Sequence, residues 1–315
     1  MGRVRVESVG RLHLGLMDLH GGLGRKFGGI GVALERPRVV VEADRADELI
    51  VEGVDKKRAR EFAERFYANF SDWVSSKAHL RVREAIPPHV GLGSGTQLAL
   101  SVGTALARLH GLDLGAMELS REMGRARRSV IGTGAFESGG FLVDGGCKDG
   151  TKSIPIIFRY PFPSDWVFVI ITPDRSRGLG GGLEDRAFDD LPSPSEETVG
   201  CICRLLVMKM LPSLVEGDII GFGTAMTRIQ RLVGDIFAPA QAGRYASDLS
   251  EELVKYTLAH GAVGAGQSSW GPAIYALVQG EDRAVELEKT VRWFTDQARV
   301  FHTSAANHGA RVIIE

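Results

Sequence analysis

The sequence has few cysteines, no excess of charge of either sign and no long apolar run. Three cysteines among 315 residues are too few and too odd in number for a disulfide framework, so we expect a reduced, cytoplasmic protein. The formal net charge of −1 lacks the basic excess typical of nucleic-acid binders. No apolar run approaches the roughly 20 residues that span a bilayer, and the opening MGRVRVESVG does not resemble a signal peptide. We therefore expect neither nucleic acid nor membrane as a partner.

Glycine, in contrast, is abundant, with 40 residues that gather in a few clusters where backbone could approach a ligand. A content of 44% hydrophobic and 24% charged residues is that of an ordinary globular chain, long enough for two domains. Prolines at 155, 161 and 163 mark a boundary, which predicts domains at residues 1–160 and 161–315. Strand and helix patterns alternate without a regular βαβ repeat, which favours an α+β fold.

The patterns place elements along the whole chain. Strands are predicted at residues 3–9, 39–43, 79–82, 139–146, 167–172, 272–278 and 309–314. Helices are predicted at residues 59–70, 116–128, 196–214, 218–232, 245–260 and 282–297, with one more before Gly111. Residues 175–194, rich in Gly, Asp and Pro, are expected to form a long loop.

The most informative segment is residues 87–111, in which a glycine run leads into an amphipathic helix. Gly91, Gly93, Ser94 and Gly95 come directly before apolar residues at helical spacing. Free N–H groups and the positive end of the helix dipole would converge there and form an anion site. A flexible turn before an ordinary helix is the alternative. In that case the hydroxyls of Ser94 and Thr96 would only cap the helix.

Residues 10–31 mix eight glycines with charged and imidazole side chains. A solvated hairpin, with Asp18 and Arg25 paired at the surface, is one interpretation. A substrate loop is the other: Asp18 would bind a metal or a cationic centre, and Arg25 would hold a carboxylate or phosphate with its planar fork. The spacing does not decide between them.

A third segment, residues 125–146, carries arginines and two carboxylates among glycines. Arg127 and Arg128 are expected at a helix end, where cations are favourable. Glu137 and Asp144 could be metal ligands or turn formers, and the two glycines that follow Asp144 favour a turn there.

A fourth segment, residues 261–275, is predicted to be a second polar glycine loop before a strand. Trp270 could be a core residue or wall an aromatic pocket. The polar loop residues are Gly264, Gly266, Gln267, Ser268 and Ser269.

The first, second and fourth segments resemble, in order and character, the three motifs of the GHMP superfamily, which is named for galactokinase, homoserine kinase, mevalonate kinase and phosphomevalonate kinase. Its second motif, P-x-x-x-G-L-G-S-S-A, is similar to the run that begins at Pro88. The resemblance implies an N-terminal domain like ribosomal protein S5 domain 2, a ferredoxin-like C-terminal domain and an active site in the cleft between them.

Two departures from this pattern are informative. Gly95 stands where the kinases have a second serine, and Arg127 or Arg128 falls near their metal-binding glutamate. Residues 132–136 fall near the segment of the catalytic aspartate. A kinase without both carboxylates has lost its Mg²⁺ ligand and its catalytic base. The fold is thus expected to be kept and the ATP chemistry lost.

One branch of the superfamily, the β-ribofuranosylaminobenzene 5′-phosphate synthases of methanopterin biosynthesis, is similar to this chain in five blocks, among them GRLHLGLMDL, GLGSGTQLAL and GAGQSSWGPAIYAL. The resemblance implies condensation of phosphoribosyl diphosphate (PRPP) with 4-aminobenzoate or 4-hydroxybenzoate. The products would be the C-riboside 5′-phosphate, CO₂ and diphosphate. Mg²⁺ would be required, ATP would not, and the protein would be a homodimer.

On this interpretation Asp18 and Arg25 are the expected catalytic residues. Thr96, Glu137 and Asp144 are the candidate metal ligands. The expected substrate-binding residues are His20, Gly91, Gly93, Ser94, Gly95, Thr96, Gln97, Arg128, Gly264, Gly266, Gln267, Ser268, Ser269 and Trp270. Two other functions remain open: an ATP-dependent small-molecule kinase with displaced catalytic residues, favoured by the glycine loop, and a non-catalytic ligand sensor, which also suits the missing carboxylates.

Overall fold

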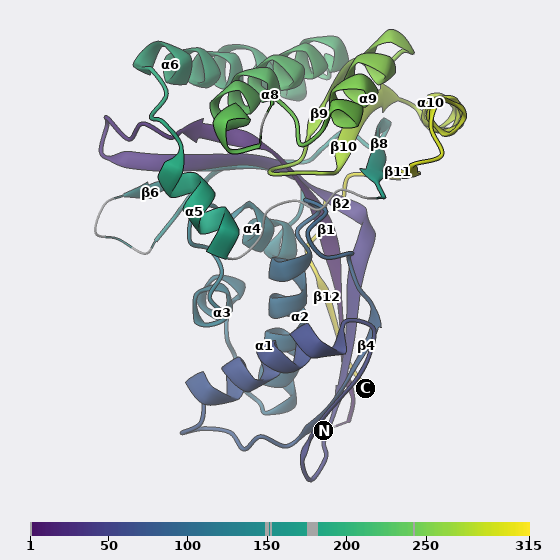
Figure 1. Ribbon diagram of the computed structural model, residues 1–315. Coiled ribbons are helices and arrows are strands. Elements are labelled where there is room, and N and C mark those ends of the chain that lie inside the picture. Colours follow the sequence, from purple (N-terminus) through teal and green to yellow (C-terminus); the bar gives the residue numbers. More distant parts are fainter. Residues whose placement is uncertain (1, 149–150, 152, 175–181, 242) are drawn as a thin grey trace.

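The chain folds into two β-sheets with helices packed on them (Figure 1). The computed structural model describes residues 2–148, 151, 153–174, 182–241 and 243–315. The larger sheet has eight strands, with β12-β1-β2-β4-β3 as its main path, and the smaller has four, in the order β11-β8-β10-β9. This mixture of helices and largely antiparallel sheets confirms the α+β class.

The strands of the larger sheet are β1 (Val4–Asp18), β2 (Arg25–Asp44), β3 (Leu49–Gly53), β4 (Ala78–Glu84), β5 (Phe141–Asp144), β6 (Cys147–Lys148), β7 (Ile156–Tyr160) and β12 (Arg311–Ile314). Those of the smaller sheet are β8 (Trp166–Pro173), β9 (Gly264–Gln267), β10 (Ile274–Gln279) and β11 (Ala298–Ser304).

The helices of the first half are α1 (Lys56–Asn69), α2 (Ser94–Leu109), α3 (Ala116–Glu122) and α4 (Ile131–Glu137). Those of the second half are α5 (Gly182–Asp190), α6 (Glu196–Leu205), the π-helical turn η1 (Leu206–Met210), α7 (Leu211–Glu216), α8 (Ile219–Gln241), α9 (Asp248–Ala259) and α10 (Glu281–Phe294).

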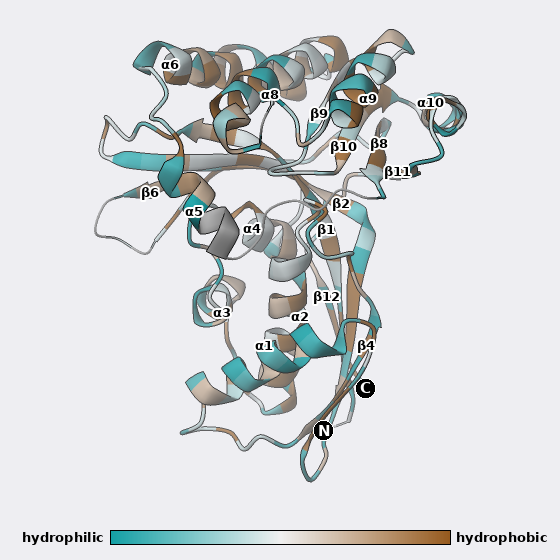
Figure 2. Cartoon of the chain, in the orientation of Figure 1, coloured by the Kyte–Doolittle hydropathy of each residue, from teal (hydrophilic) through white to brown (hydrophobic). Residues whose placement is uncertain are grey.

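The long antiparallel hairpin of β1 and β2 agrees with the hairpin interpretation of residues 10–31 and not with a loop over that whole range. The two strands pair from Val4↔Ala43 to Asp18↔Phe27, so only a short tip remains outside the ladder. The predicted strands were too short because glycines interrupt the apolar alternation on which the prediction depended. The hairpin passes beneath α6 and α8 (Figure 1), and hydrophilic residues lie near its free end (Figure 2), where Leu23 is also exposed.

The predicted helix of the second segment is confirmed as α2. Leu98, Val102, Ala105 and Leu109 are fully buried, as the helical spacing predicts, and the helix packs against β1, β2 and α1. Gly111 follows with a φ of +77°, a left-handed conformation that glycine adopts readily at helix ends.

Two helix predictions need correction. The helix expected over residues 116–128 ends at Glu122, because Gly124 takes a φ of +70° that breaks it. The loop expected over residues 175–194 contains α5, while residues 175–181 lie outside the described residues.

The smaller sheet is buried on both faces, as expected for the apolar strand at residues 167–172. Val167, Val169 and Ile171 of β8 share a core with α9 and α10, whereas Phe168 and Ile170 share the main core with Phe222 of α8. Its strand order and helical connections are those of a ferredoxin-like βαββαβ unit.

The chain ends meet in the larger sheet, where β12 pairs with β1 (Figure 1). Sheet membership changes between β7, which ends at Tyr160, and β8, which begins at Trp166, and it returns to the larger sheet with β12. The domain boundary at that residue stays a prediction. The sequence predicts no apolar run of membrane-spanning length. The continuous helical run Glu196–Glu216, however, is long and apolar enough to cross a membrane. A single helix of this kind is weak grounds for a membrane span, because core helices pass the same test.

Candidate active site

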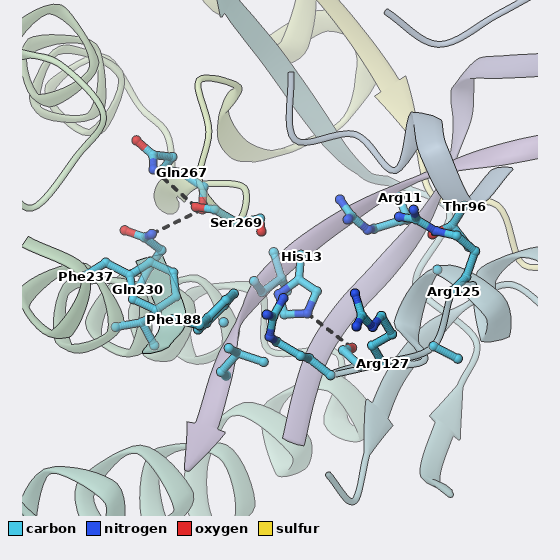
Figure 3. A pocket seen from close by; sticks show the side chains of 18 of the residues that line it. Arg11, His13, Thr96, Arg125, Arg127, Phe188, Gln230, Phe237, Gln267 and Ser269 are labelled. Atoms are coloured by element: carbon cyan, nitrogen blue, oxygen red, sulfur yellow. Dashed lines mark hydrogen bonds between the residues drawn. The ribbon is translucent and has the colours of Figure 1, made fainter. Parts of the chain in front are cut away.

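A cavity lies where β1, the first turn of α2 and the loop of residues 124–129 face α5 and α8 (Figure 3). Arginines gather at one end, aromatic side chains gather at the other, and His13 lies between them. The described residues that line it include no Asp or Glu. They are Arg11, His13, Leu14, Gly15, Leu16, Thr96, Gly124, Arg125, Ala126, Arg127, Arg128, Ser129, Gly132, Phe188, Gln230, Val233, Phe237, Gln267 and Ser269.

Three of the segments singled out in the sequence meet beside this cavity. The carbonyl oxygen of Gly91 accepts hydrogen bonds from Arg11 Nη1 and from Ser268 Oγ, each at 2.6 Å. Ser268 Oγ also accepts from the backbone N–H of His13 at 3.0 Å. Gly91 has a φ of +88°, and a Cβ there would lie 2.5 Å from the Ser268 carbonyl oxygen, so only glycine fits. Ser268 thus joins β1 to the glycine loop.

The N-terminus of α2 faces the arginine end of the cavity. Arg125 Nε donates to Thr96 Oγ1 at 3.3 Å, in the first turn of the helix. A Cβ on Gly95 would lie 3.3 Å from Arg125 Nη2, so the missing side chain gives the guanidinium room. An anion bound here would meet both the positive end of the helix dipole and the guanidinium.

Residues 124–129, which we call the arginine loop, all line the cavity, and they form a loop because α3 ends at Glu122. Ala126 has a φ of +58°, which is rare for a residue with a Cβ, and the backbone N–H of Arg125 donates to the Ser120 carbonyl oxygen at 2.7 Å. The expectation that Arg127 and Arg128 end a helix is wrong, since both lie in this loop and line the cavity.

Asp144 is fully buried and fixes the far end of the arginine loop. Its Oδ2 accepts from Ser129 Oγ at 2.6 Å and from the backbone N–H of Val130 at 3.0 Å. Its Oδ1 accepts from the N–H groups of Gly29 at 2.8 Å and Gly146 at 3.0 Å. Four donors occupy the carboxylate, so the geometry favours the turn-forming alternative over a metal ligand.

The other end of the cavity has an aromatic wall made of Phe188 from α5 and Phe237 from α8. The two rings meet edge to face at 5.7 Å, and Arg128 lies 4.5 Å above the Phe188 ring. Trp270 stacks behind Phe237 at 4.1 Å and is buried, so it supports the wall without lining the cavity. Such a wall suits a flat aromatic ligand.

His13 lies at the junction of the two ends (Figure 3). The paired register of β1 and β2 shifts between His13 and Gly15, and a bulge of this kind redirects side chains. Burial, reinforced by the neighbouring charge of Arg11, lowers the pKa of His13 from 6.5 to about 3. The imidazole is therefore neutral at physiological pH, and its Nε2 lies 3.3 Å from Ser129 Oγ.

The two expected catalytic residues lie at the hairpin tip, residues 18–25, and do not line the cavity. Asp18 Oδ1 accepts from the backbone N–H groups of His20 and Gly21, both at 2.7 Å, and no described residue hydrogen-bonds Oδ2. His20 is exposed and turns its Nδ1 to the N–H of Gly22 at 3.1 Å. The tip is thus a self-capped turn.

Arg25 holds the hairpin tip against the turn after β5. Its Nε donates to the Gly145 carbonyl oxygen at 2.6 Å, and its Nη2 donates to that of Gly146 at 2.8 Å. It forms no ion pair with Asp18 in the described part of the chain, contrary to the surface-pair alternative. The tip still adjoins the aromatic wall, because Phe27 packs edge to face on Phe188 at 5.9 Å.

The candidate metal ligands are not brought together. Thr96 accepts from Arg125, Asp144 is saturated, and Glu137 is exposed at the end of α4. No group of three or more His, Cys, Asp or Glu residues suited to a metal occurs in the described ranges. The side chains that the structure describes therefore do not form a metal cage.

The remaining predicted residues have structural contacts. Gln97 is buried and donates to the Gly132 carbonyl oxygen at 2.8 Å, and Ser94 Oγ accepts from Arg58 at 3.4 Å. Gly264 and Gly266 lie in strand β9, so the expected loop is shorter than the sequence indicated. Gln267 lines the cavity and accepts from the N–H of Ala246 at 2.7 Å.

Sequence reasoning did not assign roles to five cavity residues: Arg11, His13, Arg125, Phe188 and Phe237. Arg11 and His13 follow a glycine in GRLH, and Arg125 begins the run RARRS. This clustering of cationic residues could have indicated an anion-binding site. The two phenylalanines come from helices of the second half, and nothing in their local sequence distinguishes them from core residues.

Comparison with known proteins identifies the relatives of this chain. Residues 56–140 match the GHMP kinases N terminal domain, and residues 210–292 match the GHMP kinases C terminal domain. The chain is 33% identical to the beta-ribofuranosylphenol 5′-phosphate synthase of Methanothermobacter thermautotrophicus, with 98% of each chain covered. It is 35% identical to the protein of the same name from Archaeoglobus fulgidus, over 98% of this chain and 99% of the relative.

A solved structure with the same fold is the mevalonate kinase of Methanococcus jannaschii. It has a TM-score of 0.71 at 15% identity, with 96% of this chain and 98% of the kinase covered. Likeness at this identity shows the fold alone, and it confirms the two-domain GHMP architecture expected from the motifs.

Proposed function

The chain belongs to the beta-ribofuranosylphenol 5′-phosphate synthase family of the GHMP superfamily, and from this premise we propose that it is a PRPP-dependent, decarboxylating C-glycosyltransferase. PRPP and a 4-substituted benzoate would be the substrates, in the biosynthesis of methanopterin. The products would be a β-ribofuranosyl arene 5′-phosphate, CO₂ and diphosphate.

The observation that carries this proposal is the division of the cavity into an arginine end and an aromatic end. PRPP bears a diphosphate and a 5′-phosphate, which guanidinium groups and a helix N-terminus bind well. The benzoate offers a flat ring for Phe188 and Phe237 and a carboxylate for Arg128, which lies over the Phe188 face. A kinase would instead need carboxylates for Mg²⁺ and for the nucleophile, and the described lining contains none.

The chemistry follows from this arrangement. The bond between ribose C1 and diphosphate breaks, and its electron pair leaves with diphosphate, which the arginines stabilise as charge develops. The ring carbon that bears the carboxylate attacks the cationic C1. The bond from that carbon to the carboxylate then breaks, its electron pair restores aromaticity, and CO₂ departs.

We propose 4-hydroxybenzoate as the first arene to test, because the name of the relatives describes a phenol product. The resemblance at the level of motifs is equally compatible with 4-aminobenzoate. Both rings carry an electron-donating group opposite the carbon that attacks, as the reaction requires.

Mg²⁺ is proposed to enter with the substrate. The described cavity side chains do not form a cage for it, and Mg²⁺ is commonly held by substrate phosphates with only one or two protein groups. No step is assigned to the ion, and ATP is not proposed as a substrate. The homodimer also stays a prediction, which sedimentation velocity would check.

Asp18 and Arg25 retain a proposed role at the margin of the cavity. Asp18 is two residues beyond Leu16, which lines the cavity on the same strand, and its Oδ2 has no hydrogen-bond partner in the described part of the chain. A carboxylate in this position would favour the cationic ribose. Arg25 is proposed to bind an anionic group, the benzoate carboxylate or the diphosphate, through the edge of its guanidinium that the two carbonyl oxygens leave open.

The decisive assay supplies PRPP, Mg²⁺ and carboxyl-labelled 4-hydroxybenzoate or 4-aminobenzoate. Labelled CO₂ from at least one arene is expected, and its absence with both would refute the proposal. ATP-dependent phosphorylation of a sugar, homoserine or mevalonate would identify the kinase instead. Binding of PRPP without turnover would identify a ligand sensor.

A further inference from the structure

His13 has an unused hydrogen-bonding position at the place where the two substrates must meet. We propose that His13 Nδ1 accepts a hydrogen bond from the ribose 2′-hydroxyl of PRPP, and that Ser129 and Asp144 fix the imidazole in the tautomer that makes this possible. The inference rests on the proposed function for the identity of the ribose. The tautomer follows from the protein alone.

The direction of the hydrogen bonds sets the tautomer. All four partners of Asp144 donate to it, which leaves no acceptor for a carboxyl proton. The Ser129 hydroxyl therefore donates its one proton to Asp144 Oδ2, with Oγ and Oδ2 2.6 Å apart. Towards His13 the same oxygen can only accept, so the proton of the neutral imidazole lies on Nε2, 3.3 Å away.

Nδ1 is then left with a lone pair. None of the described residues donates a hydrogen bond to it, although the side chain is only 9% exposed and lines the cavity. Burial and the charge of Arg11 keep the pKa of His13 far below neutrality, so this lone pair is not protonated in the free protein. The charged side chains of the described lining are arginines, which donate and cannot accept.

The position of His13 selects the ribose. In Figure 3 the imidazole lies between the arginine end, where the phosphates are proposed to bind, and the aromatic wall. The new bond joins ribose C1 to the arene at this junction. The 2′-hydroxyl is the donor group next to C1, whereas the para substituent of the arene lies at the opposite end of the ring.

A hydrogen bond at this hydroxyl would act on the transition state. As the bond to diphosphate breaks, positive charge develops at ribose C1, and an acceptor for the 2′-hydroxyl proton makes its oxygen a better electron donor. His13 takes no proton in this step and forms no bond to carbon. A protonated imidazole would repel the cation, so the neutral tautomer is the productive one.

The test is a cycle of two changes, one in the protein and one in the substrate. With PRPP, His13→Leu should lower kcat about fiftyfold while KM for PRPP changes about threefold or less, because the interaction strengthens only in the transition state. PRPP that lacks the 2′-hydroxyl should cost wild type a similar factor. Together the two changes should cost little more than either alone.

His13→Asn places an amide oxygen near the position of Nδ1 and should restore most of the loss. If the two changes together lower kcat by the product of their separate factors, or if His13→Leu and wild type have equal rates, the proposed hydrogen bond is refuted. His110→Leu serves as the matched control, since it removes another partly buried histidine, bonded to Tyr67 and distant in sequence from the cavity loops.

A second measurement needs no activity and separates this inference from the proposed function. Nitrogen NMR of the full chain labelled in histidine should report His13 with its proton on Nε2, and Ser129→Ala should abolish that preference. A proton on Nδ1 of His13 in wild type would refute the proposed hydrogen-bond chain from Asp144 through Ser129 to His13. If the tautomer is as expected but neither arene yields CO₂, the proposed reaction is refuted, while the hydrogen-bond chain from Asp144 through Ser129 to His13 is confirmed.

Discussion

The hairpin tip and the arginine loop are both rich in glycine and charge, yet they use their side chains differently. At the tip, Asp18 and Arg25 turn to backbone groups of their own and a neighbouring turn. In the loop, the backbone is held from behind by Asp144, so that the arginines face the cavity. A loop whose backbone is fixed by a buried carboxylate can present several side chains to one cavity. Charge density in a sequence does not distinguish the two cases.

The largest expected effect is at the arginine loop. Arg125→Met should lower kcat/KM for PRPP by about a hundredfold or more, because a charge-assisted contact to a phosphate in a partly closed site contributes about 3 kcal/mol. Arg283→Met, which removes an exposed arginine paired with Glu286, is the control and should leave the rate unchanged. Steady-state kinetics with PRPP as the varied substrate would reveal a smaller effect, which would remove Arg125 from the site.

The hairpin tip is tested by Asp18→Asn, which removes the charge but keeps an oxygen for the N–H groups of His20 and Gly21. We expect kcat to fall by about a hundredfold, because the carboxylate is proposed to face the developing cation. The melting temperature should change little because the turn keeps its cap. A rate within a few-fold of wild type would make the tip purely structural and sharpen its contrast with the arginine loop.

The buried histidine of the cavity predicts a pH dependence of stability. Above pH 6.5, His13 is neutral in the folded and unfolded chains and contributes no difference. Between pH 6.5 and about pH 3, His13 is protonated in the unfolded chain but not in the folded chain. The free energy of unfolding therefore falls by about 1.4 kcal/mol for each pH unit of acidification in this window. Urea unfolding of wild type and His13→Asn between pH 7 and 5 should show a steeper loss for wild type.

A second histidine, His302, is expected to have the opposite effect on the pH dependence of stability. Partial burial lowers the pKa of His302, but hydrogen bonds and charge from Glu288 and Glu281 together outweigh it, so the net shift of the pKa is upward. Its contribution is present below pH 6.5 and is lost as the pH rises through the folded value. His302→Gln should therefore reduce stability at low pH, and an equal pH slope in the two histidine variants would contradict this contrast.

The smallest effect is expected at Glu137, the exposed carboxylate at the end of α4. Glu137→Gln should change kcat by about twofold or less, because the side chain is exposed and outside the cavity lining. A hundredfold loss at unchanged KM would make it a transition-state residue and would require a different site.

The elements with a clear period were predictable from the sequence. The spacing of Leu98 and Val102 defined α2, and the apolar run at residues 167–172 defined β8. Glycines that permit left-handed backbone ended α3 early, and glycines inside β1 and β2 concealed half of the hairpin. In both places the local sequence pattern predicted the wrong element bounds, because the glycine backbone conformations that decide them appear only in the folded chain.

The site was predictable in its segments but not in its side chains. The glycine loop and the segment around Ser268 meet as the motifs imply. The role of Asp144 in fixing the arginine loop could not be assigned from the sequence, because spacing along the chain does not show that its carboxylate accepts from Ser129 and from the distant Gly29. Phe188 reached the cavity from a stretch that looked like a loop, so the aromatic wall was not foreseen.

The central claim is that this cavity performs decarboxylating ribosyl transfer, and counting both small products tests it most directly. Wild type incubated with PRPP, Mg²⁺ and carboxyl-labelled 4-hydroxybenzoate or 4-aminobenzoate should release CO₂ and diphosphate in equal amounts with one of the two arenes. Arg125→Met should lose both in the same proportion. Diphosphate released without CO₂, or CO₂ release that is indifferent to Arg125, would contradict the account.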